Sequence, residues 1–318
     1  MNIDMIEAAA ARLAGHARVT PLLNAPLLDA LYGKRIYLKA ECLQLTGSFK
    51  FRGGWSAVSA LRAGTAGVLA CSSGNHGQGV ALAAARHGMR AVVVMPSDAP
   101  AVKIANTKAY GAEVVLYDRA RDDRDAIAAA LCAEQGLTLI KPYDHPQVIA
   151  GQGTVGLEVA TQSAALGVQA ADMLVCCGGG GLSSGIALAL AAHAPQITVR
   201  TVEPEGFDDM ARSLASGTRQ GNGAATGSIC DAILTPAPGE MTLPILQRLA
   251  GPGLTVTDDQ ARHAMALAFT HFRLVLEPGG AVALAAALFC DTTKTVICTA
   301  SGGNVDPAVF ADALARFG

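Results

Sequence analysis

The chain has 318 residues, of which 51% are hydrophobic and 16% charged, and its formal net charge is -2. This balance supplies no basic surplus for holding nucleic acid or an anionic membrane. Because the segment Met1–Glu7 carries acids and the later apolar runs are interrupted by Gly, His or charge, we expect no signal peptide and no membrane span. The sequence therefore predicts a cytoplasmic, enzyme-sized protein of two lobes that acts on a small molecule.

Short β-branched runs alternate with alanine-rich stretches along the chain. This alternation predicts an α/β fold in which mostly parallel strands are buried on both faces. The stretch 203–225 interrupts the pattern, and we expect a loop, a lid or a metal site there. The predicted strands are 68–71, 91–95, 112–117, 173–177, 198–202 and 295–298, and the predicted helices are 79–87, 123–134, 183–194 and 258–270.

The segment Thr46–Gly54 places Lys50 between Phe49 and Phe51. Aromatic neighbours desolvate an ammonium group and lower its pKa, which an amine needs in order to form an imine. A lysine taken alone is more often a solvated surface charge. The interpretation of Lys50 therefore depends on the other motifs of the chain.

Three predicted strands end in polar or glycine-rich loops, namely Ser72–Gly77, Gly178–Gly181 and Ser301–Asn304. In an open parallel sheet, ligands bind beyond the carboxyl ends of the strands, where helix N-termini offer free N–H groups. We therefore expect the three loops to share one cleft.

The four glycines Gly178–Gly181 favour a phosphate cradle, because backbone amides without side chains can close on phosphate oxygens. A simple tight turn is the alternative. The hydroxyls and the carboxamide of Ser72–Gly77 suit a carboxylate, although Asn75 alone fits an ordinary helix N-cap and His76 alone a structural histidine. Together these features indicate an amino acid joined to a phosphorylated aldehyde.

The chain has eight cysteines, without CxxC pairs or histidine-rich spacing. We interpret them as reduced, buried thiols. Cys176 and Cys177 are adjacent, which raises the alternative of a redox site, but their place in an apolar strand favours core packing.

The motifs TGSFKFRGG, SSGNHGQGVA, CGGGGLSSGI, VEPEGFDD and TASGGNVD occur in the order and spacing of fold-type II pyridoxal phosphate enzymes. The chain resembles the branch of serine/threonine dehydratases and serine racemases from about Thr20 to Asp306. The resemblance implies a tryptophan synthase β-like fold of two open, twisted, mostly parallel sheets with flanking helices. It also implies a large domain of residues 1–66 and 145–318, a small domain of residues 67–144 and an active site between them.

The same resemblance assigns roles to individual residues. Lys50 carries the cofactor as an imine and acts as the general base of the reaction. The substrate is bound by Ser72, Ser73, Asn75 and His76, and pyridoxal 5'-phosphate is held by Phe49, Lys50, Asn75, Gly178, Gly179, Gly180, Gly181, Leu182, Glu277 and Ser301.

One of these residues bears on the type of reaction, and two others leave alternatives open. A hydroxyl at Ser301 cannot keep the pyridine nitrogen protonated, which favours elimination or racemisation over transamination. Ser73 matches the residue that reprotonates the α-carbon in serine racemases, or it only binds the substrate carboxylate. Glu277 lies where the family has a carboxylate near the ring, and an acid at a helix start explains it as well.

Two further groups of residues suggest additional binding sites. Glu203, the carbonyl of Phe207 and Asp209 match the divalent-cation site of racemase-like members, and such oxygens suit Mg²⁺ or Ca²⁺, with a solvated acidic loop as the alternative. Arg119, Arg121 and Arg124 could bind a second carboxylate of the substrate. The alternative is that these arginines form ion pairs at a solvated helix end.

The resulting hypothesis is a pyridoxal-phosphate-dependent dehydratase, an ammonia-lyase that eliminates water from a β-hydroxy amino acid. We expect L-threonine or L-serine as the substrate. If one of the three arginines reaches the active site, 3-hydroxyaspartate becomes a serious candidate substrate. A serine or aspartate racemase is the alternative of a different reaction class, β-replacement comes third, and a sensor that only binds the cofactor or an amino acid is the non-enzyme alternative. We expect a homodimer by analogy with the family.

Overall fold

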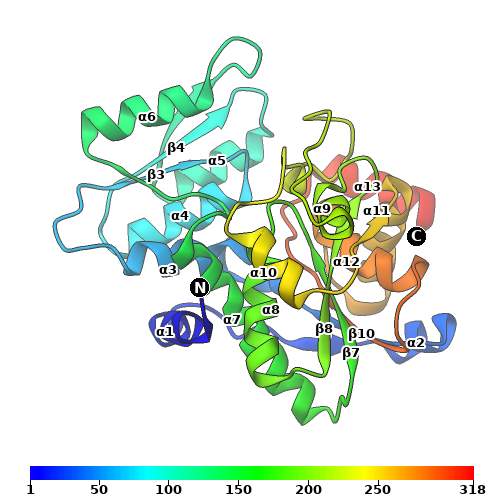
Figure 1. The fold of residues 1–318 in the computed structure, drawn as a ribbon. Helices are drawn as coiled ribbons and strands as arrows, with labels where there is room; N and C mark the ends of the chain where they lie inside the picture. The colour runs from blue at the N-terminus through cyan, green and yellow to red at the C-terminus, as the bar shows by residue number, and fades with distance from the viewer.

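A computed structural model describes residues 1–318 as two β-sheets flanked by helices (Figure 1). The larger sheet is parallel throughout except for its edge strand β1, which pairs antiparallel with β2. This arrangement confirms the predicted α/β class. The strand order is β1 (Leu22–Asn24), β2 (Arg35–Lys39), β10 (Thr295–Thr299), β7 (Ala171–Cys176), β8 (Ile197–Pro204) and β9 (Leu254–Val256).

The smaller sheet is fully parallel and has four strands. All four lie between Val68 and Leu139, inside the predicted small domain. The domain limits at residues 67 and 144 stay predictions. The strand order is β5 (Glu113–Tyr117), β4 (Ala91–Pro96), β3 (Val68–Cys71) and β6 (Thr138–Leu139).

Helices surround both sheets, and α7 packs against both α8 and α3. Short 3₁₀ turns occur at 41–43, 45–47 and 231–233, and a π-helical turn follows α11 at 268–272. The helices are α1 (Ile3–Leu13), α2 (Pro26–Tyr32), α3 (Lys50–Ser59), α4 (Asn75–Arg86), α5 (Ala101–Ala109), α6 (Arg124–Gln135), α7 (Pro146–Ala165), α8 (Gly181–His193), α9 (Asp209–Ser216), α10 (Thr242–Leu249), α11 (Asp258–Leu267), α12 (Pro278–Phe289) and α13 (Pro307–Phe317).

The six predicted strands are all present, with ends within two residues of the prediction, but the predicted start of one helix was wrong. Helix α4 begins at Asn75 rather than at residue 79, because packing against α3 overrides the low helix propensity of its glycines. A Cβ on Gly79 would lie 2.9 Å from the backbone carbonyl of Lys50, so the two helices approach closely. The predicted loop 203–225 begins on β8 and contains α9.

A buried ionic network lies where β2, α3 and α7 meet. Arg52 donates from Nε and Nη2 to Glu41 at 2.8 Å each, and from Nη1 to Glu158 at 2.7 Å. Lys39 also pairs with Glu158. Since Arg52, Glu41 and Lys39 are almost completely buried, each charge depends on its partners to offset the cost of leaving water.

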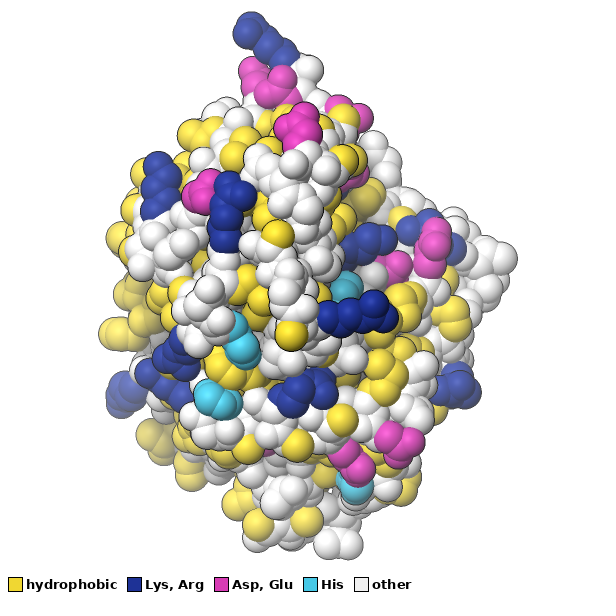
Figure 2. Space-filling view, turned by 90° about the vertical axis from the view of Figure 1, so that its left-hand side faces the viewer, with side chains coloured by type: hydrophobic (Ala, Val, Ile, Leu, Met, Phe, Trp, Pro, Cys, Tyr) yellow, Lys and Arg dark blue, Asp and Glu magenta, His cyan; other side chains and the backbone are white.

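All eight cysteines are free, and Cys176 and Cys177 are buried at the end of β7. No helix is both long enough and apolar enough to cross a membrane. On the face drawn in Figure 2, lysine and arginine side chains are scattered among acidic and apolar ones. That face therefore presents no continuous basic surface.

We predict that Arg52→Met lowers the free energy of unfolding by about 3–5 kcal/mol, because Glu41 is left as a buried, unpaired charge. Urea-induced unfolding measures the change. The matched control is Arg90→Met, which breaks an exposed pair with Glu113 and is expected to cost about 0–1 kcal/mol. Equal losses in the two variants would contradict a structural role for the buried network.

Candidate active site

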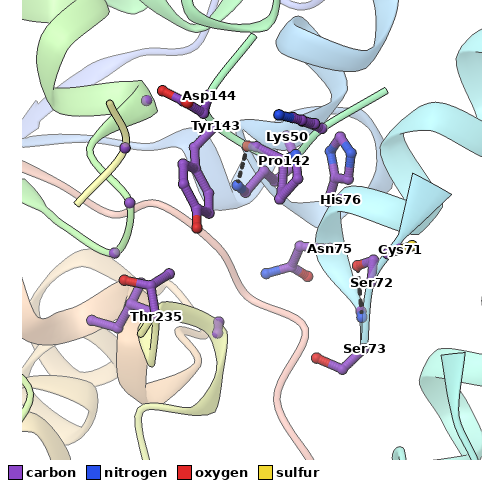
Figure 3. Close-up of a pocket in the computed structure, with 18 of the residues that line it drawn as sticks. Lys50, Cys71, Ser72, Ser73, Asn75, His76, Pro142, Tyr143, Asp144 and Thr235 are labelled. Atoms are coloured by element: carbon purple, nitrogen blue, oxygen red, sulfur yellow. Dashed lines mark hydrogen bonds between the residues drawn. The ribbon is translucent and has the colours of Figure 1, made fainter. Parts of the chain in front are cut away.

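One cavity of about 830 Å³ collects the three loops that were expected to share a cleft. One wall comes from residues that follow β3, and the opposite wall from residues that follow β7 and β10, so the cavity lies between the two sheets. Figure 3 shows Lys50, Pro142 and Tyr143 close together on one side, with Ser72, Ser73 and Asn75 on another. The expected shared cleft is therefore present.

Lys50 is the first residue of α3. A turn with two consecutive residues in the left-handed region of φ precedes this helix. Thr46 has a φ of 63° and Gly47 a φ of 74°. The left-handed region costs a threonine of the order of 1–3 kcal/mol, so the surrounding contacts must hold this turn. The Phe49 N–H donates to the Ser301 carbonyl at 3.1 Å, which ties the start of α3 to the loop after β10.

The Lys50 amine is buried and donates to the Pro142 carbonyl at 2.9 Å (Figure 3). It also lies 5.0 Å from the centre of the Phe49 ring. Burial lowers the pKa of Lys50 to about 8, which is the direction that the aromatic neighbours predict. The neutral, nucleophilic form of this amine is therefore far more populated near neutral pH than in an ordinary lysine.

The glycine run Gly178–Gly181 joins β7 to α8. Gly180 is the N-cap of α8 with a φ of 87°, and no side chain caps the helix, so its first N–H groups are free. A Cβ on Gly181 would lie 2.7 Å from Gln152 Oε1, which makes the loop a tight backbone cradle. Free amides and the helix dipole fit a phosphate, so the residues present suit pyridoxal phosphate.

A second uncapped helix start lies across the cavity at α4. Its N-cap is Gly74, and no side chain hydrogen-bonds to its first N–H groups. Ser72 Oγ accepts a hydrogen bond from the Gly74 N–H at 3.1 Å, while the half-buried Ser73 lines the cavity. The α4 N-terminus and the Ser73 hydroxyl together suit a carboxylate.

The ring of His76 cannot supply the contact to a substrate carboxylate that the sequence predicts for this residue. The ring is buried, and its Nε2 lies 2.8 Å from the Ile140 carbonyl. Burial, with the nearby Lys50 as a smaller cause, lowers the pKa of His76 to about 3, so the ring is neutral. Because Nε2 must donate to the carbonyl, Nδ1 carries no proton and cannot donate to a substrate. Only the backbone N–H of His76 remains suitable.

Asn75 and Glu277 meet at the base of the cavity, where Asn75 Nδ2 donates to Glu277 Oε1 at 2.5 Å. Burial raises the pKa of Glu277 to about 7, and the neighbouring Lys103 opposes this shift. Lys103 Nζ lies 3.9 Å from Glu277 and 3.1 Å from Asp231, so one cation serves both carboxylates. Ser301 is buried in the same wall.

Several residues of the cavity were not anticipated from the sequence. Lys103 sits in an ordinary helix, and Tyr143 follows β6, where no motif marks it. The Tyr143 ring covers Gly179 closely enough that a Cβ there would clash. Arg219 lines the opening, with its Nε donating to the Pro238 carbonyl at 2.7 Å. Asn304 lay inside a quoted motif, but only its contacts reveal a role.

Of the three arginines considered for a second carboxylate, only Arg124 lines the cavity. Arg119 pairs with Asp98, and Arg121 lies 3.7 Å from Asp118, both on the surface. The solvated ion-pair alternative therefore describes Arg119 and Arg121. Arg124 also pairs with its neighbour in the sequence, but its position keeps it facing the cavity.

The residues predicted to bind a cation lie outside the cavity, around the start of α9. Glu203 is on β8, and its two carboxylate oxygens accept hydrogen bonds from the N–H groups of Met210 and Ala211. Asp209 Oδ1 accepts from Asn222 at 2.6 Å, while the buried Oδ2 has no partner. Burial, then the charge of Asp209, raises the pKa of Glu203 well above its usual range. Two buried carboxylates with an unpartnered oxygen fit a hard cation, although no cluster of three His, Cys, Asp or Glu side chains forms in the structure.

The comparisons with known proteins agree with this geometry. The chain belongs to the PALP family of pyridoxal-phosphate dependent enzymes, whose model matches residues 13–304. It is 42% identical to an L-threo-3-hydroxyaspartate ammonia-lyase from Pseudomonas sp, over 98% of this chain and 97% of that protein. It is 37% identical to a serine racemase from Schizosaccharomyces pombe, over 98% and 97% of the two chains.

Among solved structures, a threonine deaminase from T.th. superposes with a TM-score of 0.92 at 45% identity, covering 96% of this chain and 99% of that one. The fold is therefore of type II, as predicted. The chain is an enzyme whose family uses pyridoxal phosphate.

The lowered pKa of Lys50 predicts how the cofactor attaches. We expect the rate at which pyridoxal phosphate binds covalently to the cofactor-free protein to rise with pH and to level off above about pH 8, because only the neutral amine reacts. An unperturbed lysine would give a rate that still rises beyond about pH 10. Stopped-flow absorbance measures the rate, with Lys50→Ala as the variant that forms no band.

Proposed function

We propose that the protein eliminates water from a β-hydroxy amino acid and releases a 2-keto acid and ammonia. The observation that supports this most directly is the position of the buried Lys50 amine between two uncapped helix N-termini. The start of α8 suits the phosphate of pyridoxal phosphate, and the start of α4 suits the carboxylate of an amino acid. An amine between these two anion sites is placed beside the α-carbon of the substrate.

Pyridoxal phosphate, when bound, withdraws electrons from the α-carbon and so makes its proton easier to remove. In this proposal Lys50 holds the cofactor and then accepts that proton as general base. Its lowered pKa, about 8, makes the neutral form that can accept the proton more accessible than in an ordinary lysine. Asn75, Ser301 and Phe49 line the cavity and would hold the cofactor, Asn75 by a hydrogen bond to the 3-oxygen, Ser301 through its hydroxyl near the ring nitrogen and Phe49 by packing against the ring.

The substrate carboxylate is oriented by Ser72, Ser73 and the first N–H groups of α4, in this proposal. The Pro142 carbonyl accepts a hydrogen bond from Lys50 and so fixes the direction of the amine.

The products of the reaction test this proposal. Purified protein is expected to carry a visible cofactor band and to release a keto acid and ammonia from at least one of serine, threonine and the 3-hydroxyaspartate isomers. Lys50→Ala is expected to lose both the band and at least about 1,000-fold in rate, because it removes the attachment point and the base. A wild-type protein that binds the cofactor but releases no keto acid from any of these substrates would favour a sensor.

A racemase is the second candidate, and Ser73 is the residue that favours it. Its half-buried hydroxyl lines the cavity, and no hydrogen bond to protein holds it there. Chiral analysis of recovered substrate is the measurement that separates the two functions. If Ser73 returns the proton, Ser73→Ala stops racemisation and leaves elimination from the L-isomer; if it only binds the carboxylate, both activities fall together.

The two arginines of the cavity favour a dicarboxylic substrate such as 3-hydroxyaspartate. Arg124 comes from the small-sheet side and Arg219 from the loop after α9, so they flank the opening from two elements. Arg219 has no carboxylate within ion-pair distance, and its terminal nitrogens are free to bind an anion. We propose that these arginines recognise the second carboxylate.

We predict that Arg219→Met and Arg124→Met each raise KM for 3-hydroxyaspartate by at least about tenfold, the loss expected for a charged hydrogen bond, while KM for threonine changes by less than about twofold. Steady-state kinetics with both substrates measure the difference. Arg119→Met is the matched control, since Arg119 pairs with Asp98 on the surface. Equal effects on both substrates would argue against a dicarboxylate site.

We also propose that Glu203, the Phe207 carbonyl and Asp209 hold a Mg²⁺ or Ca²⁺ ion. The support is the pair of buried carboxylates and the unpartnered Asp209 Oδ2. Such an ion would stabilise the start of α9, because Glu203 caps that helix.

Saturating Mg²⁺ or Ca²⁺ is therefore expected to raise the melting temperature by a few degrees, because a ligand that binds only the folded state stabilises it. Asp209→Asn is expected to abolish this rise. The neighbouring Asp208→Asn, which removes only an ion pair with Arg212, is expected to keep it. A metal response that persists in Asp209→Asn would contradict the site.

The family resemblance supports three coarser proposals. We propose that the chain forms a homodimer in the cytoplasm, that residues 67–144 form the small domain, and that residues 1–66 and 145–318 form the large one. Leu27 and Leu31, on one face of α2, are 79% and 67% exposed and offer apolar surface for a partner subunit.

A further inference from the structure

Asn304, in the loop after β10, connects two parts of the active site. Its Nδ2 donates to the Thr46 carbonyl and to Asn75 Oδ1, both at 2.8 Å. The Thr46 carbonyl belongs to the turn that leads to Lys50. Asn75 is the first residue of α4 and lines the cavity. One side-chain amide therefore contacts both the turn before the lysine and the carboxamide beside the cofactor position.

Asn304 packs tightly against the Thr46–Gly47 turn. A Cβ on Gly47 would lie 2.5 Å from Asn304 Oδ1, so no side chain fits at that position. The Gly303 N–H donates to the Gly47 carbonyl at 2.9 Å, which adds a backbone bond beside the side-chain one. Since Thr46 and Gly47 both have left-handed φ angles, the turn depends on such external partners.

The contact with Asn75 fixes which way that carboxamide faces. An amide presents an acceptor oxygen on one side and a donor nitrogen on the other. Because the only donor hydrogens of the Asn304 side chain are on Nδ2, the Asn75 atom that meets them must be the oxygen. Asn75 Nδ2 then faces Glu277 Oε1 and the cavity.

We propose that Asn304 is a positioning residue: it holds Asn75 so that a donor, not an acceptor, faces the 3-oxygen of bound pyridoxal phosphate, and it holds the Thr46–Gly47 turn that places Lys50. This inference rests on the proposed function for the identity of the cofactor. A donor at that point stabilises the ionised 3-oxygen, whereas an acceptor would repel it and favour the protonated form. Asn304 itself does not touch the substrate.

Asn304→Asp tests the orientation, because a carboxylate of the same size accepts but cannot donate. Asn75 is then expected to turn, so that its nitrogen meets the introduced carboxylate and its oxygen faces the cavity. We expect the visible band of the loaded protein to weaken while a near-ultraviolet band grows, and the cofactor affinity to fall by at least about tenfold. Absorbance and equilibrium titration with pyridoxal phosphate measure the two effects.

Asn24→Asp is the matched control. Asn24 Nδ2 also donates two hydrogen bonds, to Asp29 at 2.9 Å and to the Ile36 carbonyl at 3.0 Å, but it lies on β1 away from the cavity. The spectrum and affinity of this variant are expected to match those of the wild type. A spectral change in both variants would mean that the effect arises from general destabilisation, and the proposal would fail.

A double-mutant cycle with Asn75→Ala tests whether Asn304 acts through Asn75. If it does, Asn304→Asp changes the ratio of the two bands in the wild-type background but not in the Asn75→Ala background. Additive changes would overturn the orienting role of Asn304 toward Asn75, because they would show that Asn304 affects the cofactor without acting through that carboxamide.

A crystal structure of cofactor-free Asn304→Asp separates this proposal from the proposed function. A turned Asn75 carboxamide, recognised from its hydrogen-bond partners, supports the positioning role even if the enzyme proves to use another substrate. An unturned Asn75 would overturn the role even if the wild type is a dehydratase. Thr46→Gly is expected to restore part of the melting temperature that Asn304→Ala loses, since glycine adopts the left-handed turn without external support.

Discussion

The contact on which the site depends is the docking of the loop after β10 onto the turn before α3. The Phe49 N–H bonds to the Ser301 carbonyl, the Gly303 N–H bonds to the Gly47 carbonyl, and Ser48 forms an isolated bridge with Gly302. These bonds join segments about 250 residues apart in the chain. They hold a left-handed turn that would otherwise relax, and they bring Lys50 beside the carboxyl ends of the strands of the larger sheet.

The energetic arrangement around this contact follows from the burial of charge. Lys50 is buried without a carboxylate partner, so its pKa falls. Arg52, two residues further along α3, is buried as well, but Glu41 and Glu158 surround it and it stays charged. The same short helix thus presents an amine that loses its proton easily on one side and a fixed cation on the other. The two pKa values shift in opposite directions because two carboxylates pair with Arg52, whereas none forms an ion pair with Lys50.

The cavity itself combines backbone and side-chain electrostatics. Two helix N-termini supply partial positive charge to the cavity, and the side chain of Lys103 packs beside Gly74 at the start of α4. At the base of the cavity, the positive charge of Lys103 offsets the negative charge of Glu277. Arg124 and Arg219 add charge only at the opening, where the side chain of a substrate would lie. The groups proposed to carry out the reaction are thus separate from the arginines proposed to recognise the side chain of the substrate.

The sequence by itself determined the strands, the glycine cradle and the candidate lysine, because these depend on local composition and on motifs of fixed spacing. It misplaced the start of α4, since the packing of Gly79 against α3 is a contact between distant segments. It named His76 as a substrate-binding residue without showing which of its atoms could serve, and the bond from its ring to the Ile140 carbonyl leaves only the backbone N–H. Lys103, Tyr143 and Arg219 have ordinary neighbours in the sequence, and the motif that contains Asn304 does not reveal what its side chain contacts. Only the tertiary structure decided their roles, because burial, hydrogen-bond direction and the closeness of two charges are set by residues far along the chain.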